Sequence, residues 1–129
     1  MSTQGFVFIV LGSLFAFLSV AAGAFGAHAL KSILDPGMLI VYETAAKYQM
    51  YHALALFVVA WQMTRLPTSR VSLAGWLFCL GIILFSGSLY IVAGTGLKGF
   101  GAVTPLGGVA FLTGWAILGW TACRQKAAS

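Results

Sequence analysis

The sequence predicts an all-α fold: an integral membrane four-helix antiparallel bundle that forms a single domain over residues 1–129. Of the 129 residues, 60% are hydrophobic and only 7% are charged, whereas soluble domains carry about 25% charged residues. The charged residues separate four uncharged runs, at 2–30, 48–64, 71–97 and 99–123. A helix of about 20 apolar residues spans a bilayer. Because the connections between the runs are short, consecutive helices should be antiparallel neighbours.

The first helix is expected over residues 5–28. Small residues recur on it every seven positions, at Gly5, Gly12, Ser19 and Gly26. A stripe with this period lets a second helix approach closely, so we interpret it as a packing seam. A signal peptide is the alternative, because small residues near the end of the run could form a cleavage site. The long apolar stretch and the absence of basic residues before it favour a retained helix.

The second helix is expected over residues 36–65, because Asp35 is a good N-cap and Pro36 suits the first helical position. It is longer than a bilayer requires, so its first two turns should lie outside the hydrocarbon. At about 100° per residue, Tyr48, Gln49 and His52 share one face, which we expect to point into the bundle. The opposite face is apolar and suits contact with lipid.

The third helix is expected over residues 71–94, and the fourth over residues 104–123, where Thr104 and the proline after it repeat the cap-and-proline signal. Residues 94–99, between them, match G-x-G-x-x-G, the pattern of a dinucleotide-binding loop. No strand is expected before this pattern, and no acidic residue follows Glu43. We therefore interpret residues 94–99 as a connecting loop.

The basic residues predict how the bundle is oriented. Four of them, including all three arginines, lie on the side of the two termini, and three lysines lie on the opposite side. The positive-inside rule therefore predicts both termini in the cytoplasm. The seven basic residues are scattered at the ends of the apolar runs, which indicates membrane orientation and no nucleic-acid partner.

Polar residues from all four helices should meet in the outer half of the bundle, away from the termini. This candidate polar pocket consists of His28, Tyr48, Gln49, His52, Ser86, Ser88, Tyr90 and Thr104. The cytoplasmic half is expected to be apolar. Intramembrane polar groups often mark function, but hydrogen bonds between such groups also hold helices together. A structural network and a ligand or proton site both remain open.

The residue types present argue against catalysis and against a bound cofactor or metal. Only Asp35 and Glu43 are acidic, which excludes a paired-carboxylate hydrolase and an oxygen-rich metal site. A serine beside His52 would lack an acid to orient the histidine. Haem ligation by His28 and His52 is an alternative, although their predicted depths differ. The two cysteines are interpreted as reduced, small apolar residues, with a disulfide or metal site as the alternative.

Four short motifs follow one another along the chain. They are GAFGAHAL at 23–30, YQMYHALAL at 48–56, LFSGSLY at 84–90, and TPLGG at 104–108 followed by GW at 114–115. Together they resemble the transmembrane protein 256 family, whose bacterial members are known as domain of unknown function 423. The resemblance covers all four helices and implies a small multi-pass protein of the bacterial plasma membrane. It marks the pocket residues as motif positions and assigns them no role.

Two functional hypotheses follow from the sequence. The first is a non-enzymatic accessory or assembly partner in the membrane, in contact with lipid and with a protein partner or a second copy of itself. Its basis is the small-residue seams, the short loops and the absence of a catalytic set. The second is binding or transport of a small ligand, lipid, quinone or proton at the candidate polar pocket.

Overall fold

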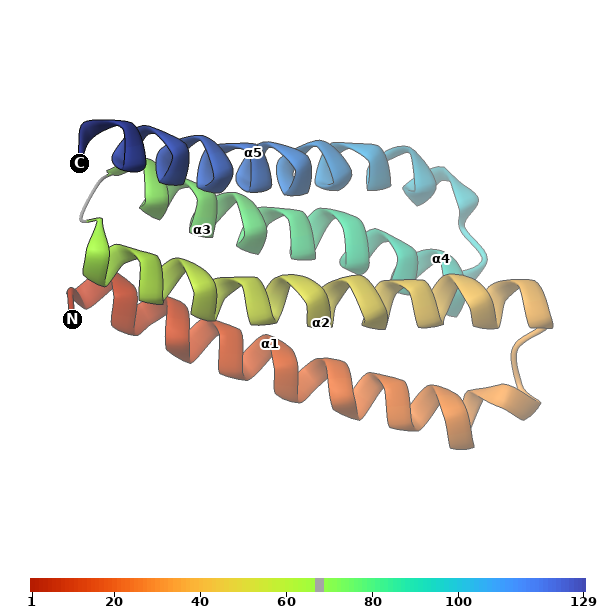
Figure 1. Ribbon diagram of the computed structural model, residues 1–129. Coiled ribbons are helices and arrows are strands. Elements are labelled where there is room, and N and C mark those ends of the chain that lie inside the picture. The colour runs from red at the N-terminus through yellow and green to blue at the C-terminus, as the bar shows by residue number, and fades with distance from the viewer. Residues whose placement is uncertain (67–68) are drawn as a thin grey trace.

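The computed structural model describes residues 1–66 and 69–129, and its helices lie side by side with both termini at one end of the bundle (Figure 1). The elements in chain order are α1 (Thr3–His28), a 3-10 turn (Leu30–Ser32), α2 (Pro36–Arg65), α3 (Ser69–Gly81), a π-helical turn (Ile82–Ser86), α4 (Gly87–Thr95), a 3-10 turn (Lys98–Ala102) and α5 (Thr104–Ala128). Because α3, the π-helical turn and α4 follow without a break, they form the third rod. The predicted all-α antiparallel four-helix bundle is confirmed.

Local sequence signals set the helix starts. The side chain of Asp35 accepts a 3.0 Å hydrogen bond from the Met38 backbone, and Pro36 is the first residue of α2. The expected cap of the last helix is wrong, because Val103 holds the N-cap position of α5 and makes no side-chain cap bond. Thr104 is instead the first helical residue, and its hydroxyl bonds Ser88 on α4. A tertiary contact therefore takes the place of the local cap.

The seven-residue stripe of α1 is a packing seam. The buried residues of α1 are Gly5, Phe8, Gly12, Ser19 and Gly26. A Cβ atom added to Gly12 would lie 2.9 Å from the carbonyl oxygen of Ala53 on α2. The hydroxyl of Ser19 donates to the carbonyl oxygen of Ala46 on α2 at 2.7 Å. The small residues thus bring the two backbones close enough for a direct side-chain-to-backbone bond.

The core lies between α1, α2, α3 and α5, and several of its aromatic rings pack directly against glycines. Phe78 of α3 is fully buried, and a Cβ at Gly114 of α5 would lie 2.6 Å from its ring. In the same way, a Cβ at Gly75 would lie 2.5 Å from the ring of Phe8. Close packing of this kind is sensitive to the addition of a single methyl group.

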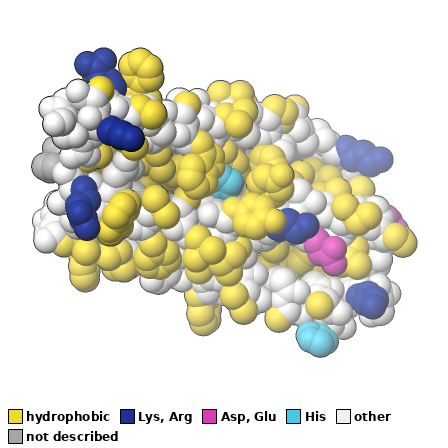
Figure 2. Space-filling model, viewed as in Figure 1, with side chains coloured by type: hydrophobic (Ala, Val, Ile, Leu, Met, Phe, Trp, Pro, Cys, Tyr) yellow, Lys and Arg dark blue, Asp and Glu magenta, His cyan; other side chains and the backbone are white. Residues whose placement is uncertain are grey.

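Three rods are long and apolar enough to cross a membrane, namely Thr3–His28, Ser69–Thr95 and Lys98–Ala128. Among the described residues, α2 is outside this group because its sequence is more polar, although the sequence predicts four spans. It packs against α1, α3 and α4, and it buries Gln49, His52 and Gln62. Hydrophobic side chains cover the middle of the face in Figure 2, with most of the basic residues toward the two ends.

Candidate functional site

His52 lies near the middle of α2, and both of its ring nitrogens are hydrogen-bonded. Its Nδ1 is 2.8 Å from the carbonyl oxygen of Tyr48. The indole Nε1–H of Trp115 on α5 donates to its Nε2 at 3.1 Å. Because a carbonyl only accepts and an indole N–H only donates, we assign the hydrogen to Nδ1 and a lone pair to Nε2. This arrangement corresponds to the neutral imidazole, and each of its two nitrogens has a hydrogen-bond partner.

Aromatic rings complete the surroundings of His52. Its ring stacks on Phe111 of α5, with centroids 3.5 Å apart and planes 7° apart. Phe78 of α3 lies on another side, 5.5 Å away between centroids. The side chain is only 4% exposed. The fold thus fixes the imidazole by stacking as well as by hydrogen bonds.

Gln49 joins three of the four rods through its amide. Its Nε2 donates to the carbonyl oxygen of Phe15 on α1 at 2.9 Å. Its Oε1 accepts from the hydroxyl of Tyr90 on α4 at 2.8 Å. The ring of Tyr90 packs edge-on against Tyr42 of α2, with centroids 5.3 Å apart. The amide therefore acts as a bridge between helices.

The two serines of the candidate polar pocket, both on the third rod, also bond within the bundle. Ser86, in the π-helical turn, donates to the carbonyl oxygen of Ala45 on α2 at 2.7 Å. Ser88 lies 2.6 Å from the hydroxyl of Thr104 and 3.0 Å from the carbonyl oxygen of Phe85. Because a serine has one hydroxyl hydrogen, these contacts form a chain in which Thr104 donates to Ser88 and Ser88 donates to Phe85.

Two predicted pocket residues do not point into the bundle, so their expected orientation is wrong. His28 is exposed at the end of α1, because it lies about 200° around the helix from Gly26, which faces α2. The haem alternative needs both histidines and is not supported by this geometry. Tyr48 was expected to point inward, but it is 38% exposed and packs against the rings of Tyr51 and Phe85. The thiols of the two cysteines are free, so the disulfide alternative does not hold.

An aromatic groove opens beside His52 between α2 and α5. The groove has a volume of about 500 Å³ and is lined by Tyr48, Tyr51, His52, Phe85, Gly108, Phe111, Leu112 and Trp115. Figure 2 shows a histidine recessed among hydrophobic side chains midway along this face. His52 contributes to the wall of the groove while its polar atoms are already paired. The groove therefore offers an occupant mostly aromatic and aliphatic surface.

The half of the bundle near the termini is not apolar as predicted. It buries Gln62, Ser72 and Thr121, and Ser72 donates to the side chain of Gln4 at 2.6 Å. The signal for Gln62 was present in the sequence, because it follows the inward-facing Ala55 by seven residues and so shares its face. Thr121 gave no comparable signal, since a threonine near the end of an apolar helix is common on either face.

Most of the residues that meet in this site lie in a segment that matches a known protein family. Residues 22–108, which include Gln49, His52, Ser86 and Thr104, match the model described as "Protein of unknown function (DUF423)". The chain belongs to this family. The resemblance inferred from the four sequence motifs is confirmed. Trp115, which donates to His52, lies outside the matched segment.

Curated relatives are similar to the chain over most of their length. UPF0382 membrane protein YwdK of Bacillus subtilis (strain 168) is 50% identical over 113 residues, which cover 87% of this chain and 92% of that protein. A UPF0382 membrane protein of Staphylococcus haemolyticus (strain JCSC1435) is 46% identical over 112 residues, with coverage of 87% and 91%. No solved structure matches the chain. This DUF423 chain is accordingly a membrane protein.

Proposed function

We propose that this protein is a non-enzymatic accessory or assembly partner for another membrane protein in the bacterial plasma membrane, with both termini in the cytoplasm. The observation that carries the proposal is the pairing of the polar side chains inside the bundle. His52, Gln49, Ser86 and Ser88 each bond a neighbouring side chain or backbone carbonyl. These bonds lie between helices or within one helix, and they support a role of the network in holding the bundle together.

The geometry of His52 also argues against proton transfer. A protonated imidazole carries hydrogens on both nitrogens. Its Nε2–H would then face the indole N–H of Trp115, which lies 3.1 Å away and can only donate. Two opposed donors repel each other, so the surroundings favour the neutral ring. The network is therefore suited to holding helices together.

The proposed interaction surface is the aromatic groove, and its proposed occupant is a transmembrane helix of the partner protein. Tyr51, Leu112 and Trp115 stand exposed around it. Gly108 lies in its wall, where a Cβ would meet only the ring of Phe85, at 4.0 Å. Helices associate in lipid by close van der Waals packing next to small residues. A concave wall with a glycine and protruding aromatic side chains provides such packing.

The test fills the groove without disturbing the core. We expect Gly108→Leu to project a side chain into the groove, and Gly119→Leu on the same helix to be the matched control, because a Cβ at Gly119 meets nothing within 4 Å. Tagged wild type and both variants are extracted in mild detergent from bacterial membranes, and the size of each assembly is measured. Wild type and Gly119→Leu should run as a larger complex, and Gly108→Leu should not. A solitary wild-type protein would refute the proposal.

The second hypothesis, a bound apolar small molecule, is favoured by one observation. The groove volume of about 500 Å³ falls within the range of roughly 300–1,000 Å³ typical of small-molecule sites. A lipid chain or a quinone ring would suit its aromatic walls. Mass spectrometry of compounds extracted from the same preparations separates the two hypotheses. A stoichiometric compound present in wild type and lost only from Gly108→Leu would favour the ligand.

A further inference from the structure

A second site lies at the end of the bundle that carries the termini. A crevice of about 290 Å³ separates the start of α3 from the last turns of α5. It is lined by Leu66, Ser69, Arg70, Thr121, Arg124 and Gln125. We call this set the basic crevice. Its polar atoms come from two arginines, two hydroxyls and one amide, all of which can donate hydrogen bonds to an anion.

Thr121 is the feature that points to a ligand. Its side chain is 8% exposed, and its Oγ1 is the single buried side-chain nitrogen or oxygen without a hydrogen-bond partner in the part of the chain that the structure describes. Other helical threonines bond their own helix: Thr44, Thr95 and Thr113 each donate to the carbonyl oxygen four residues earlier, at 2.6–2.8 Å. Thr121 makes no such bond. A buried hydroxyl without a partner is costly, so this unpaired group beside the basic crevice needs an explanation.

The excess of positive charge at this end also favours the binding of an anion from outside the protein. Arg65, Arg70, Arg124 and Lys126 all lie near the termini. The two acidic residues of the whole sequence, Asp35 and Glu43, belong to the first turns of α2 at the opposite end. No aspartate or glutamate side chain lies at this end to neutralise the arginines of the basic crevice. Ser69 and Arg70 begin α3, and the positive end of that helix dipole also favours an anion.

The depth of the basic crevice matches the headgroup region of a bilayer. The guanidinium of Arg124 lies 5.9 Å from the ring centroid of Trp120, and that of Arg65 lies 5.6 Å from Trp61. Tryptophan is enriched at the membrane–water interface, and both tryptophans are 60% exposed. Such pairs favour a placement of this end of the bundle at the level of the lipid phosphates.

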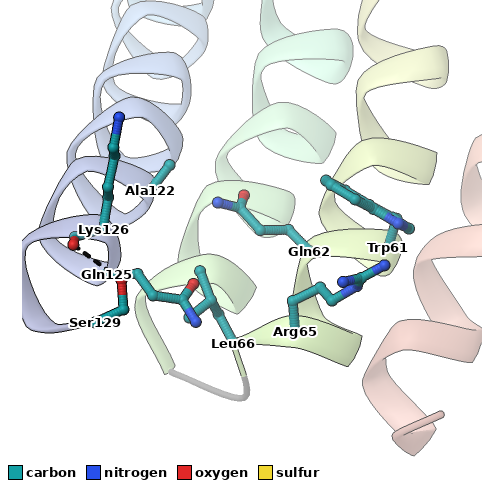
Figure 3. Close-up of a pocket in the computed structure, with 8 residues that line it drawn as sticks. All are labelled: Trp61, Gln62, Arg65, Leu66, Ala122, Gln125, Lys126 and Ser129. Carbon is teal, nitrogen blue, oxygen red and sulfur yellow. Dashed lines mark hydrogen bonds between the residues drawn. The ribbon is translucent and has the colours of Figure 1, made fainter.

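A neighbouring pocket extends the same polar surface (Figure 3). It shares Leu66 and Gln125 with the basic crevice and adds Gln62 and Lys126. Figure 3 shows Gln62 pointing from α2 toward α5, while Arg65 turns toward Trp61. The added donors provide hydrogen-bond partners for the glycerol and the second polar group of a larger headgroup, beside the phosphate.

We propose that the basic crevice binds the phosphate of an anionic phospholipid in the leaflet at the terminal end of the bundle. Arg70 and Arg124 neutralise the phosphate charge, and the hydroxyl of Thr121 donates to a phosphate oxygen. Basic pockets between transmembrane helices recognise such headgroups by this chemistry. The site is separate from the aromatic groove, so it does not depend on the function proposed above.

The test measures lipid binding to the full chain by native mass spectrometry in detergent. Phosphatidylglycerol, phosphatidylcholine and inorganic phosphate are titrated separately. Wild type should prefer phosphatidylglycerol to phosphatidylcholine. Thr121→Val keeps the size of the side chain and removes the hydroxyl, and Arg124→Gln removes one charge. Each should weaken phosphatidylglycerol binding by about tenfold, the effect expected for a lost hydrogen bond to a charged group.

Two matched control variants show whether a loss of lipid binding is specific to the basic crevice. Thr113→Val removes a hydroxyl of α5 that bonds Val109, and Lys98→Gln removes one positive charge at the opposite end. Both should bind phosphatidylglycerol as wild type does. Equal affinity for Thr121→Val and Thr113→Val would overturn the proposal. Tight binding of inorganic phosphate without a preference between the two lipids would overturn it as well, because it would assign the site to a soluble phosphate.

Discussion

The hydrogen bond between Trp115 and His52 provides the sharpest test of the view that the polar network holds the helices together. We consider His52→Phe, Trp115→Phe and the double variant. Phenylalanine at 52 keeps a planar ring stacked on Phe111, and phenylalanine at 115 keeps a ring beside Phe78, whose centroid lies 4.9 Å from that of Trp115. Each replacement therefore removes the hydrogen-bonding atoms and leaves most of the packing.

The expected magnitude follows from the contacts. Hydrogen bonds between membrane helices average about 0.6 kcal/mol in double-mutant cycles and reach about 1.7 kcal/mol. The Trp115–His52 distance of 3.1 Å and the burial of His52 favour the upper part of that range. We therefore expect a coupling energy of roughly 1 kcal/mol between the two sites. His52→Ala should cost more, about 3 kcal/mol, because it also leaves a cavity beside Phe111.

The assay is reversible unfolding in mixed micelles by titration with sodium dodecyl sulfate, followed by helical circular dichroism, so that loss of Trp115 does not alter the readout. The free energy of unfolding is compared for wild type, both single variants and the double variant. A coupling energy near zero would refute the reasoning, because the two side chains would then contribute independently. A His52→Phe variant as stable as wild type that loses an assembly or a ligand would show that His52 has a functional role.

Three further predictions concern other parts of the bundle. Gly107→Ala should destabilise the protein by about 1–3 kcal/mol in the same titration, because a Cβ there overlaps the backbone nitrogen of Phe85. Gln49→Met should cost about 1–2 kcal/mol, because two interhelical hydrogen bonds are lost together. A membrane-impermeant maleimide should label Cys123, which is exposed, only from the cytoplasmic side, and should leave the buried Cys79 unlabelled until the protein unfolds.

Each of these predictions has a control or an outcome that contradicts it. Gly119→Ala, where a Cβ has open space, should be as stable as wild type, and an equal loss in both glycine variants would point to helix propensity and not to the close approach. A stable Gln49→Met would show that the amide bridge does not hold the rods together. Labelling of Cys123 in intact cells without permeabilisation would place the termini outside the cytoplasm.

The sequence by itself determined the features that depend on local physical chemistry. The lengths of the uncharged runs determined the helices, since hydrocarbon requires internally bonded backbone. Asp35 determined the start of α2, because capping involves residues within one turn. The spacing of Gly5, Gly12, Ser19 and Gly26 determined the seam of α1, because residues seven apart lie on one side of a helix.

The tertiary structure decided which side chains meet. His52 bonds Trp115, which lies 63 positions along the chain, and no spacing rule connects them. Helical periodicity groups residues on a face, but the direction of that face depends on how each rod is rotated against its neighbours. His28 and Tyr48 turned outward for this reason, and Thr121 turned into the basic crevice. Inter-rod packing sets these rotations. Only the assembled bundle could therefore separate the paired polar groups from the unpaired hydroxyl of Thr121.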